Sequence, residues 1–345
     1  MRDVAQRAGV SIATVSFVVN DSKRVTPETR KRIEAAMAEL GFRRNVVARA
    51  LASRRTRIIA LIYPVLEHRM GGSSMEFVTS AAQTASDADY HLVVWPVSTD
   101  GHELSALVGQ GLVDGVLLME VQLDDARVDA LRKLDIPFAL IGRTQDVTGL
   151  DYVDIDFDIT MDTAVDHLWE LGHRSIMLVC GSQDEESFKN YGPYVRLEAA
   201  YRRIANERDF QPMIMRCRQT VASGRRVAQQ LVTEACGATA VIIADEAAAA
   251  GLIAGLHGQG VRVPMDLSVM SVISSKDMAF ICDPPLTTVT AAGIELGRLG
   301  VEALLRQLQG EAPMRPVLRA GTLEIRDSTA RLATPKVRRT KKPVS

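Results

Sequence analysis

Long apolar runs and clustered cysteines are both missing from this chain of 345 residues. No run reaches the roughly 18 apolar residues that a membrane span needs, so we expect no transmembrane helix. The first residues contain Asp3 and no apolar segment, so we expect no signal peptide. The four cysteines lie far apart, without metal-site or disulfide-framework spacing, which favours reduced thiols in a cytoplasmic protein.

Catalytic signatures are missing as well. The six histidines are scattered, and the chain has no Gly-x-Ser-x-Gly, no Gly-x-x-x-x-Gly-Lys and no His-Glu-x-x-His motif. Gly109-Gln110-Gly111 lacks the next glycine of a dinucleotide-binding loop. We therefore expect no enzyme, no metal site and no cofactor.

Charge is distributed unevenly, although the net charge is only −1. Residues 1–57 hold 13 Lys and Arg against 5 Asp and Glu, whereas residues 58–334 hold 23 against 37. The tail after residue 334 adds five basic residues and no acid. A short basic segment on an acidic body suggests one module that binds a polyanion and another module with a different function.

The N-terminal segment predicts three short helices. The first covers about residues 2–8 and ends at Gly9, because glycine takes the left-handed conformation without strain. The second starts after Ser11, a good N-cap, and runs to about Val19. The third opens with Thr26-Pro27-Glu28, a cap, a proline at the first helical position and an acid in the first turn. The first two helices have the proportions of a helix-turn-helix.

The second helix has an unusual outward face. Val15 and Val19 are four residues apart, share one side of the helix and should point inward. The other side, which we expect to meet base edges, carries Ile12, Ala13, Ser16 and Phe17. Outward apolar groups suit thymine methyls, and Thr14, Ser16 and Asn20 suit phosphate contacts. Ser11 is also expected at the DNA. The alternative is a small three-helix domain that binds no nucleic acid.

From Ile58 onward, short apolar runs alternate with helical stretches. The candidate strands are 58–65, 91–97, 113–119, 137–142, 175–180, 239–244 and 268–274, and helices include 159–171 and 191–207. Nearly continuous apolar strands that alternate with helices predict parallel sheets covered on both faces. A stretch this long usually divides into two lobes.

Several motifs resemble the lactose-repressor/galactose-repressor family. They are Asp3-Val4-Ala5, Ala8-Gly9-Val10-Ser11, Thr14-Val15-Ser16, Val18-Val19-Asn20, Leu171-Gly172-His173-Arg174 and Pro285-Leu286-Thr287-Thr288-Val289. The similarity covers about residues 1–329. It implies an all-α helix-turn-helix headpiece and an α/β two-lobed body like periplasmic binding proteins, with parallel sheets. It also implies a repressor that binds palindromic, double-stranded operator DNA as a homodimer and senses a small molecule between the lobes.

The resemblance suggests these domain boundaries. The headpiece is 1–44, the hinge helix and linker 45–57, the body 58–333 and a basic disordered tail 334–345. Within the body, lobe one is about 58–160 and 290–319, and lobe two is about 161–289 and 320–333. The tail carries no leucine heptads, so we expect no tetramer.

The segment Asn45-x-x-Ala48-x-x-Leu51 resembles the family's hinge helix. The family's hinge helices pair in the minor groove, and the leucine that matches Leu51 wedges into a base step and kinks the duplex. We expect this short segment to order only on DNA. The hinge residues expected to contact DNA are Asn45, Val46, Arg49, Leu51 and Arg54.

Two positions of the headpiece depart from the family pattern. Phe17 stands where an arginine that reads guanine is usual, so we expect thymine or shape readout there. Met1 stands where a Ser or Thr cap is common, so either the first helix is uncapped or the true start lies upstream.

The effector site departs further. The family's Asn-Asp pair corresponds to Ala244-Asp245, its later aspartate to Ser274, and its arginine is displaced to Arg196. Three possibilities stay open: a less hydroxylated or aromatic metabolite bound by Arg143, Arg196, Asp245 and Ser274, a sugar with rearranged contacts, or no small effector. A solute-binding protein of the periplasmic type is the alternative from another class. Induction and corepression both remain possible.

Overall fold

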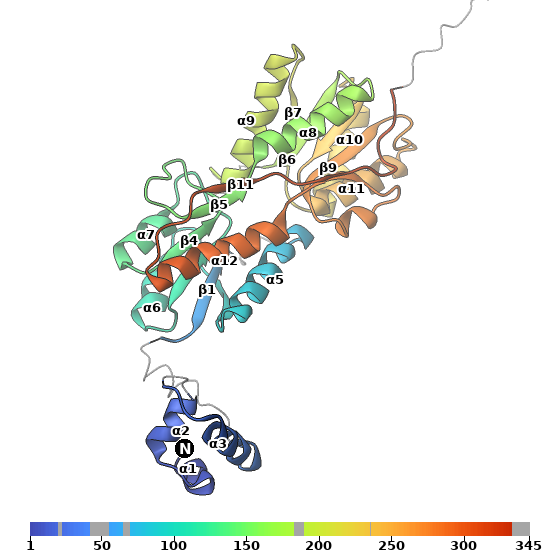
Figure 1. The fold of residues 1–345 in the computed structure, drawn as a ribbon. Helices are drawn as coiled ribbons and strands as arrows, with labels where there is room; N and C mark the ends of the chain where they lie inside the picture. Colours follow the sequence, from blue (N-terminus) through green and yellow to red (C-terminus); the bar gives the residue numbers. More distant parts are fainter. Residues whose placement is uncertain (20–22, 42–54, 65–69, 183–189, 235, 333–345) are drawn as a thin grey trace, which may run out of the picture. The chain divides into compact units, whose positions relative to one another are not determined.

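The computed structural model of the chain contains two compact units (Figure 1). The described residues are 1–19, 23–41, 55–64, 70–182, 190–234 and 236–332. One unit comprises residues 1–57 with 111–114, and the other comprises the rest of the chain.

The N-terminal unit holds α1 (Arg2–Ala8), α2 (Ile12–Val19) and α3 (Pro27–Glu39). All three predicted helices are present, with their predicted boundary residues. Gly9 ends α1 with a φ of 63°, and the Ser11 hydroxyl accepts the Thr14 N–H at 3.1 Å. Thr26 caps α3 by accepting the Thr29 N–H at 3.4 Å. No side chain caps α1, whose N-cap residue is Met1.

One small core joins the three helices. Its buried members are Val4, Ala5, Ala8, Val15, Val18, Val19, Ile33 and Ala36. Arg32 of α3 donates to the Ala8 carbonyl oxygen at 2.8 Å, at the turn between α1 and α2. The inner side of α2 is therefore held by apolar contacts, and the turn before it is held by a hydrogen bond.

The second unit contains two six-stranded sheets, and we call each sheet with its helices a lobe. The sheet of lobe one has the order β11-β5-β4-β3-β1-β2, and all its strand pairs are parallel. The strands are β1 (Ile58–Tyr63), β2 (His91–Pro96), β3 (Gly115–Leu118), β4 (Phe138–Ile141), β5 (Tyr152–Ile155) and β11 (Val317–Arg319). The helices α5 (Gly72–Asp87), α6 (Leu104–Gly109), α7 (Ala126–Leu134) and α12 (Gly293–Gln309) belong to this lobe, with α5 beside α12 (Figure 1).

The sheet of lobe two has the order β12-β10-β9-β8-β6-β7, with only the β10–β12 pair antiparallel among the described strands. The strands are β6 (Ile176–Gly181), β7 (Met213–Cys217), β8 (Ala240–Ile243), β9 (Ser268–Ser274), β10 (Thr287–Thr290) and β12 (Leu323–Glu324). Its helices are α8 (Phe157–Glu170), α9 (Gly192–Glu207), α10 (Val221–Thr233), α11 (Glu246–Gly258) and the 3₁₀ turn η2 (Met278–Phe280).

The parallel α/β architecture agrees with the sequence, and the described strands add detail that the sequence did not predict. β5, β7, β10, β11 and β12 were not among the candidate strands. Along the described strands the chain passes between the sheets three times: after β5, after β10 and after β11. No helix of the described residues is both long and apolar enough to cross a membrane.

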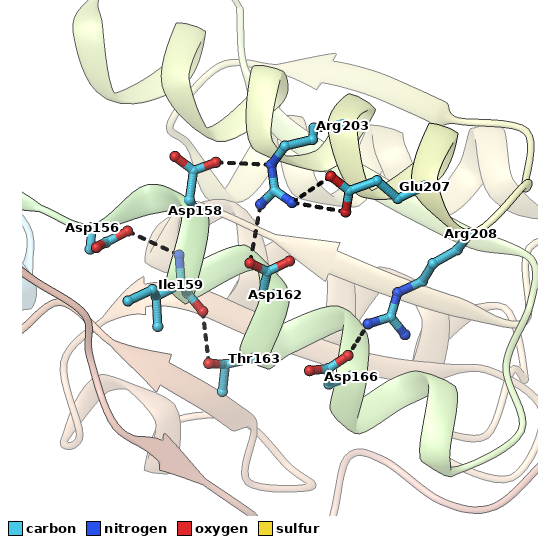
Figure 2. A network of polar contacts seen from close by, with 9 residues as sticks. All are labelled: Asp156, Asp158, Ile159, Asp162, Thr163, Asp166, Arg203, Glu207 and Arg208. Atoms are coloured by element: carbon cyan, nitrogen blue, oxygen red, sulfur yellow. Dashed lines mark hydrogen bonds and ion pairs between the residues drawn. The ribbon is translucent and has the colours of Figure 1, made fainter.

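Two packing features position the helices of lobe two. α10 and α11 approach closely at Gly224, where an added Cβ would lie 2.0 Å from the Ala248 carbonyl oxygen. Arg203 of α9 and Arg208, which follows α9, bind carboxylates across the surface, as Figure 2 shows. The carboxylates of α8 are Asp158, Asp162 and Asp166, and Glu207 on α9 also binds Arg203. These contacts link the exposed surfaces of α8 and α9.

Candidate functional site

The exposed side of α2 is the candidate nucleic-acid interface. Val15 is fully buried, whereas the side chain of Ile12 is 47% exposed. Ala13 is also exposed, and Ser16 and Phe17 are half-buried. The structure therefore places the four residues predicted to read bases outside the headpiece core. Ala13, Ser16 and Phe17 point away from the buried valines, and Ile12 lies in the first turn of α2.

Polar and charged groups surround this face. The Ser11 and Thr14 hydroxyls are hydrogen-bonded to each other at 2.8 Å, so both are held at the N-terminus of α2. The Lys23 ammonium lies 5.1 Å from the centre of the Phe17 ring, a cation–π distance. The Phe17 ring, for which thymine or shape readout was predicted, therefore has a basic group beside it.

The hinge residues predicted to contact DNA, together with Asn20, lie outside the described residues. They are Asn20, Asn45, Val46, Arg49, Leu51 and Arg54. The segment that follows the hinge is described, and it is anchored on Asp114. The Asp114 carboxylate accepts the Thr56 N–H at 2.6 Å and the Arg57 N–H at 3.0 Å. This double contact fixes the backbone just before β1.

A cavity of about 760 Å³ lies between the two lobes. The residues that line it follow strands of both sheets and begin the helices α5, α8, α9, α10 and α11. Ligands of open α/β sheets bind at these carboxyl ends of strands. The aromatic side chains of its wall are Tyr63, Phe77, Phe157, Tyr191 and Tyr194. The size suits a small molecule, and the rings provide large apolar surfaces for it.

Glu246 joins the two lobes across this cavity. Its carboxylate accepts the N–H groups of Gly72 at 2.7 Å and Ser73 at 3.1 Å, which begin α5 in lobe one. It also accepts the Ser275 N–H at 2.6 Å and the Ser274 hydroxyl at 3.3 Å, both in lobe two. A single side chain therefore satisfies amide groups on both sides of the cavity.

Asp154 of β5 faces the cavity from lobe one. Its Oδ2 lies 3.5 Å from Arg143 Nε and 3.8 Å from Arg196 Nη1. Both Asp154 Oδ2 and Arg196 Nη1 are buried, and neither has a hydrogen-bond partner among the described residues. Burial raises the pKa of Asp154 to about 6, even though the two arginines oppose that rise. A buried polar atom without a partner costs free energy, which a ligand group could recover.

Asp245 faces the cavity from lobe two, at the start of α11. It caps this helix by accepting the Ala248 N–H at 2.6 Å. Burial raises the pKa of Asp245 to about 6, and the neighbouring Glu246 charge adds to the rise. The described residues give Asp245 no cationic partner, in contrast to Asp154.

Tyrosines complete the cavity wall. The Tyr191 hydroxyl donates to Glu120, and the Gln219 amide donates to the Tyr194 hydroxyl. The two rings meet edge to face with their centres 4.7 Å apart. Burial raises the pKa of both hydroxyls, so these tyrosines are neutral hydrogen-bonding groups.

The four residues predicted to bind an effector have different positions. Asp245 lines the cavity, while Arg143 and Arg196 stand behind Asp154, and Ser274 donates to Glu246. Their effector contacts stay predictions. Five residues that line the cavity had not been predicted from the sequence: Glu120, Asp154, Tyr191, Tyr194 and Glu246. Glu120 and Glu246 follow strands that had been predicted, and this position after a strand could have marked them as candidate ligand-binding residues.

Comparisons with known proteins match both units. The family model of bacterial regulatory proteins, lacI family, matches residues 1–45, and that of the periplasmic binding protein-like domain matches residues 165–329. The lactose operon repressor of Escherichia coli is 30% identical over 341 residues, which cover 95% of this chain and 92% of the repressor. Catabolite control protein A of Priestia megaterium is 27% identical over 335 residues, 95% of this chain and 98% of that protein.

Solved structures agree with this result. The Lac repressor dimer bound to operator and the anti-inducer ONPF superimposes with a TM-score of 0.80 at 27% identity, covering 95% of this chain and 98% of that chain. The complex of the transcriptional regulator CelR with cellobiose has a TM-score of 0.69 at 26% identity, with the same coverage. These similar proteins are transcriptional regulators, and each extends over both units of this chain.

Proposed function

The chain belongs to the LacI family of bacterial regulatory proteins and is a DNA-binding transcriptional regulator, and from this premise we propose how it works. It acts as a repressor that binds a palindromic operator as a homodimer and responds to a small molecule in the interlobe cavity. One observation carries the proposal: α2 buries Val15, Val18 and Val19 in the headpiece core, and it exposes Ala13 on the opposite side and Ile12 in its first turn. That is the geometry of a helix that enters a major groove.

DNA contact is divided between α2 and the hinge. The proposed contacts are Ser11, Ile12, Ala13, Thr14, Ser16, Phe17, Asn20, Asn45, Val46, Arg49, Leu51 and Arg54. The headpiece is 1–44, the hinge 45–57, the two-lobed body 58–333 and the tail 334–345. Phosphate contacts fix the register of the helix, and the apolar groups meet thymine methyls.

Effector binding uses the cavity between the lobes. The solved relatives that carry cellobiose and the anti-inducer ONPF support a small ligand here. Asp245 contacts the ligand directly, whereas Arg143, Arg196 and Ser274 act through Asp154 and Glu246. A ligand that prefers one arrangement of the lobes shifts DNA affinity, and such coupling is typically about 1–3 kcal/mol.

Dimerisation uses the body. The side chains of Phe280 and Ile281 are 62% and 65% exposed, and Met75 on α5 is also exposed. These segments are close to each other, because an added Cβ on Gly72 would lie 2.4 Å from the side chain of Met278. A homodimer would bury this apolar surface. The dimer works in the cytoplasm, where operator DNA lies, without catalysis and without a cofactor.

Footprinting on the DNA upstream of the protein's own operon tests the proposal. A palindrome should be protected, and affinity should fall roughly 10³-fold or more between 50 mM and 200 mM salt, because several phosphate contacts release counterions. The variant without residues 1–57 should lose the footprint. Binding that ignores sequence would reject the proposed function.

A further inference from the structure

The helix N-termini around the cavity are already occupied by groups of the protein itself. A helix N-terminus is a ready site for an anion, because its first N–H groups are unpaired and its dipole is positive. Here Glu246 binds the first amides of α5, Asp245 caps α11, Asp156 caps α8 and Thr220 caps α10. At α9, the Gly192 N–H donates to the Val121 carbonyl oxygen, and Pro193 has no N–H. An anionic ligand would therefore compete with a protein group at each of these helix starts.

The charged groups among the described residues that line the cavity are all carboxylates. Asp154 Oδ2 is buried without a hydrogen-bond partner, and Asp245 has no cationic partner among the described residues. The described residues that line the cavity include no lysine, arginine or histidine. Arg143 and Arg196 are near, but they stand behind Asp154 and partly neutralise it. A ligand is therefore expected to donate hydrogen bonds to these carboxylates. A positive charge on the ligand is expected to lie beside Asp245.

Apolar side chains form a large part of the remaining wall. Phe77, Met119, Phe157, Ile273 and Met278 line the cavity together with the tyrosine rings. Such a surface binds an aromatic or aliphatic body better than a ring covered with hydroxyl groups, because each buried hydroxyl must find a partner. The wall thus complements a ligand whose polar group is concentrated at one end.

We propose that the cavity selects a ligand with a protonated amine on an aromatic or apolar body, with the amine bound to Asp245, and that it rejects anionic ligands. This inference rests on the proposed function, since it names the chemical class of the effector. A buried carboxylate without a cation is costly, and a ligand ammonium offsets that cost. A ligand phosphate or carboxylate would meet four protein carboxylates instead: Glu120, Asp154, Asp245 and Glu246.

Three probes with the same ring test the proposal on the full-length protein. Tyramine, tyrosol and 4-hydroxyphenylacetate end in an ammonium, a hydroxyl and a carboxylate, and their affinities are measured by isothermal titration calorimetry at pH 7.5. Tyramine should bind at least about tenfold more tightly than tyrosol, and the acid should bind most weakly. In Asp245→Asn, the advantage of tyramine over tyrosol should disappear while tyrosol affinity stays unchanged. Asp87→Asn, an exposed site on α5, should keep the wild-type order.

Any other order of affinities overturns the inference. The amine site is rejected if 4-hydroxyphenylacetate binds as tightly as tyramine. It is also rejected if none of the three probes binds at millimolar concentration. A retained tyramine preference in Asp245→Asn rejects the assigned carboxylate, provided that circular dichroism shows a folded variant. Footprinting on the same preparation separates the two proposals: an intact footprint with failed amine binding leaves the regulator function standing, whereas a missing footprint rejects that function.

Discussion

The Glu246 carboxylate accepts the backbone N–H of Gly72 at 2.7 Å, although 174 positions of sequence separate these residues and they belong to different lobes. The contact depends on glycine, because an added Cβ at Gly72 would lie 2.7 Å from the Ser275 hydroxyl oxygen and closer still to Met278. One side chain thus connects the start of α5 to lobe two. This contact gives an observable for the arrangement of the two lobes.

Replacing Glu246 by alanine should release that contact. The Gly72 and Ser73 amides have their described partner in Glu246, so their hydrogen exchange should accelerate strongly in Glu246→Ala. Mass spectrometry of the peptide that contains them measures the change in full-length protein. Glu311→Ala, on the surface after α12, should leave the exchange of this peptide unaltered. If this peptide exchanged at the same rate in both variants, the Glu246 contact would not protect these amides.

Two residues of α2 should separate folding from DNA binding. Val15→Ala removes fully buried methyl groups and should destabilise the headpiece by about 2 kcal/mol. Ile12→Ala changes a side chain that is 47% exposed, so it should weaken DNA binding with little effect on stability. Hydrogen exchange of α1–α3 and titration with operator DNA provide the two readouts. A headpiece destabilised equally by both changes would mean that Ile12 belongs to the core.

Phe17 should determine one position of the operator. An arginine there can donate two hydrogen bonds to guanine, which a phenylalanine cannot do. Phe17→Arg is therefore expected to move the preference toward guanine at one symmetric position of each half-site. Selection from a randomised operator library measures this, with Lys23→Arg as a control that keeps the neighbouring charge. An unchanged preference would remove Phe17 from the reading surface.

Stability should depend on pH through Asp245. Its folded pKa of about 6 exceeds its ordinary value of 3.8, so between these values the folded state binds more protons than the unfolded state. Its contribution to the free energy of unfolding therefore falls as pH rises through this window. Asp245→Asn can still cap α11 and should be more stable than the unliganded wild type at pH 7.5, by at most about 3 kcal/mol. Thermal melts at pH 7.5 and pH 4 test this, and a gain of the same size at both values would contradict it.

The surface network between α8 and α9 should contribute little. Arg203 binds Asp158, Asp162 and Glu207, yet these side chains are substantially exposed (Figure 2). Exposed ion pairs contribute about 0–1 kcal/mol, so Arg203→Ala should cost at most about 1 kcal/mol, and less at high salt. Urea unfolding at two salt concentrations measures this. A loss several times larger, or one that salt does not reduce, would show that the network is more than a surface contact.

Local signals predicted most of the secondary structure. The headpiece helices have recognisable boundary residues, such as Gly9 and Thr26, because capping depends only on neighbouring residues. Strands such as β6 and β8 are continuous apolar runs. β5 and β10 escaped recognition because they are short and carry buried polar residues, Asp154 in β5 and threonines in β10.

The cavity was less accessible to sequence reasoning. Asp245 could be selected because it follows an apolar strand, where ligand groups of parallel sheets gather. Arg143 and Arg196 had the right chemistry, but the fold brings both to Asp154 on β5, a strand that had not been recognised. The pairing of Glu246 with Gly72 could not be inferred, because it depends on how the two lobes come together.

The three passages of the chain between the two sheets have a practical consequence for protease digestion. A single cut after β5, β10 or β11 would leave two uncut connections between the lobes. The nicked body should therefore elute as one species from a sizing column and separate into fragments only in denaturant.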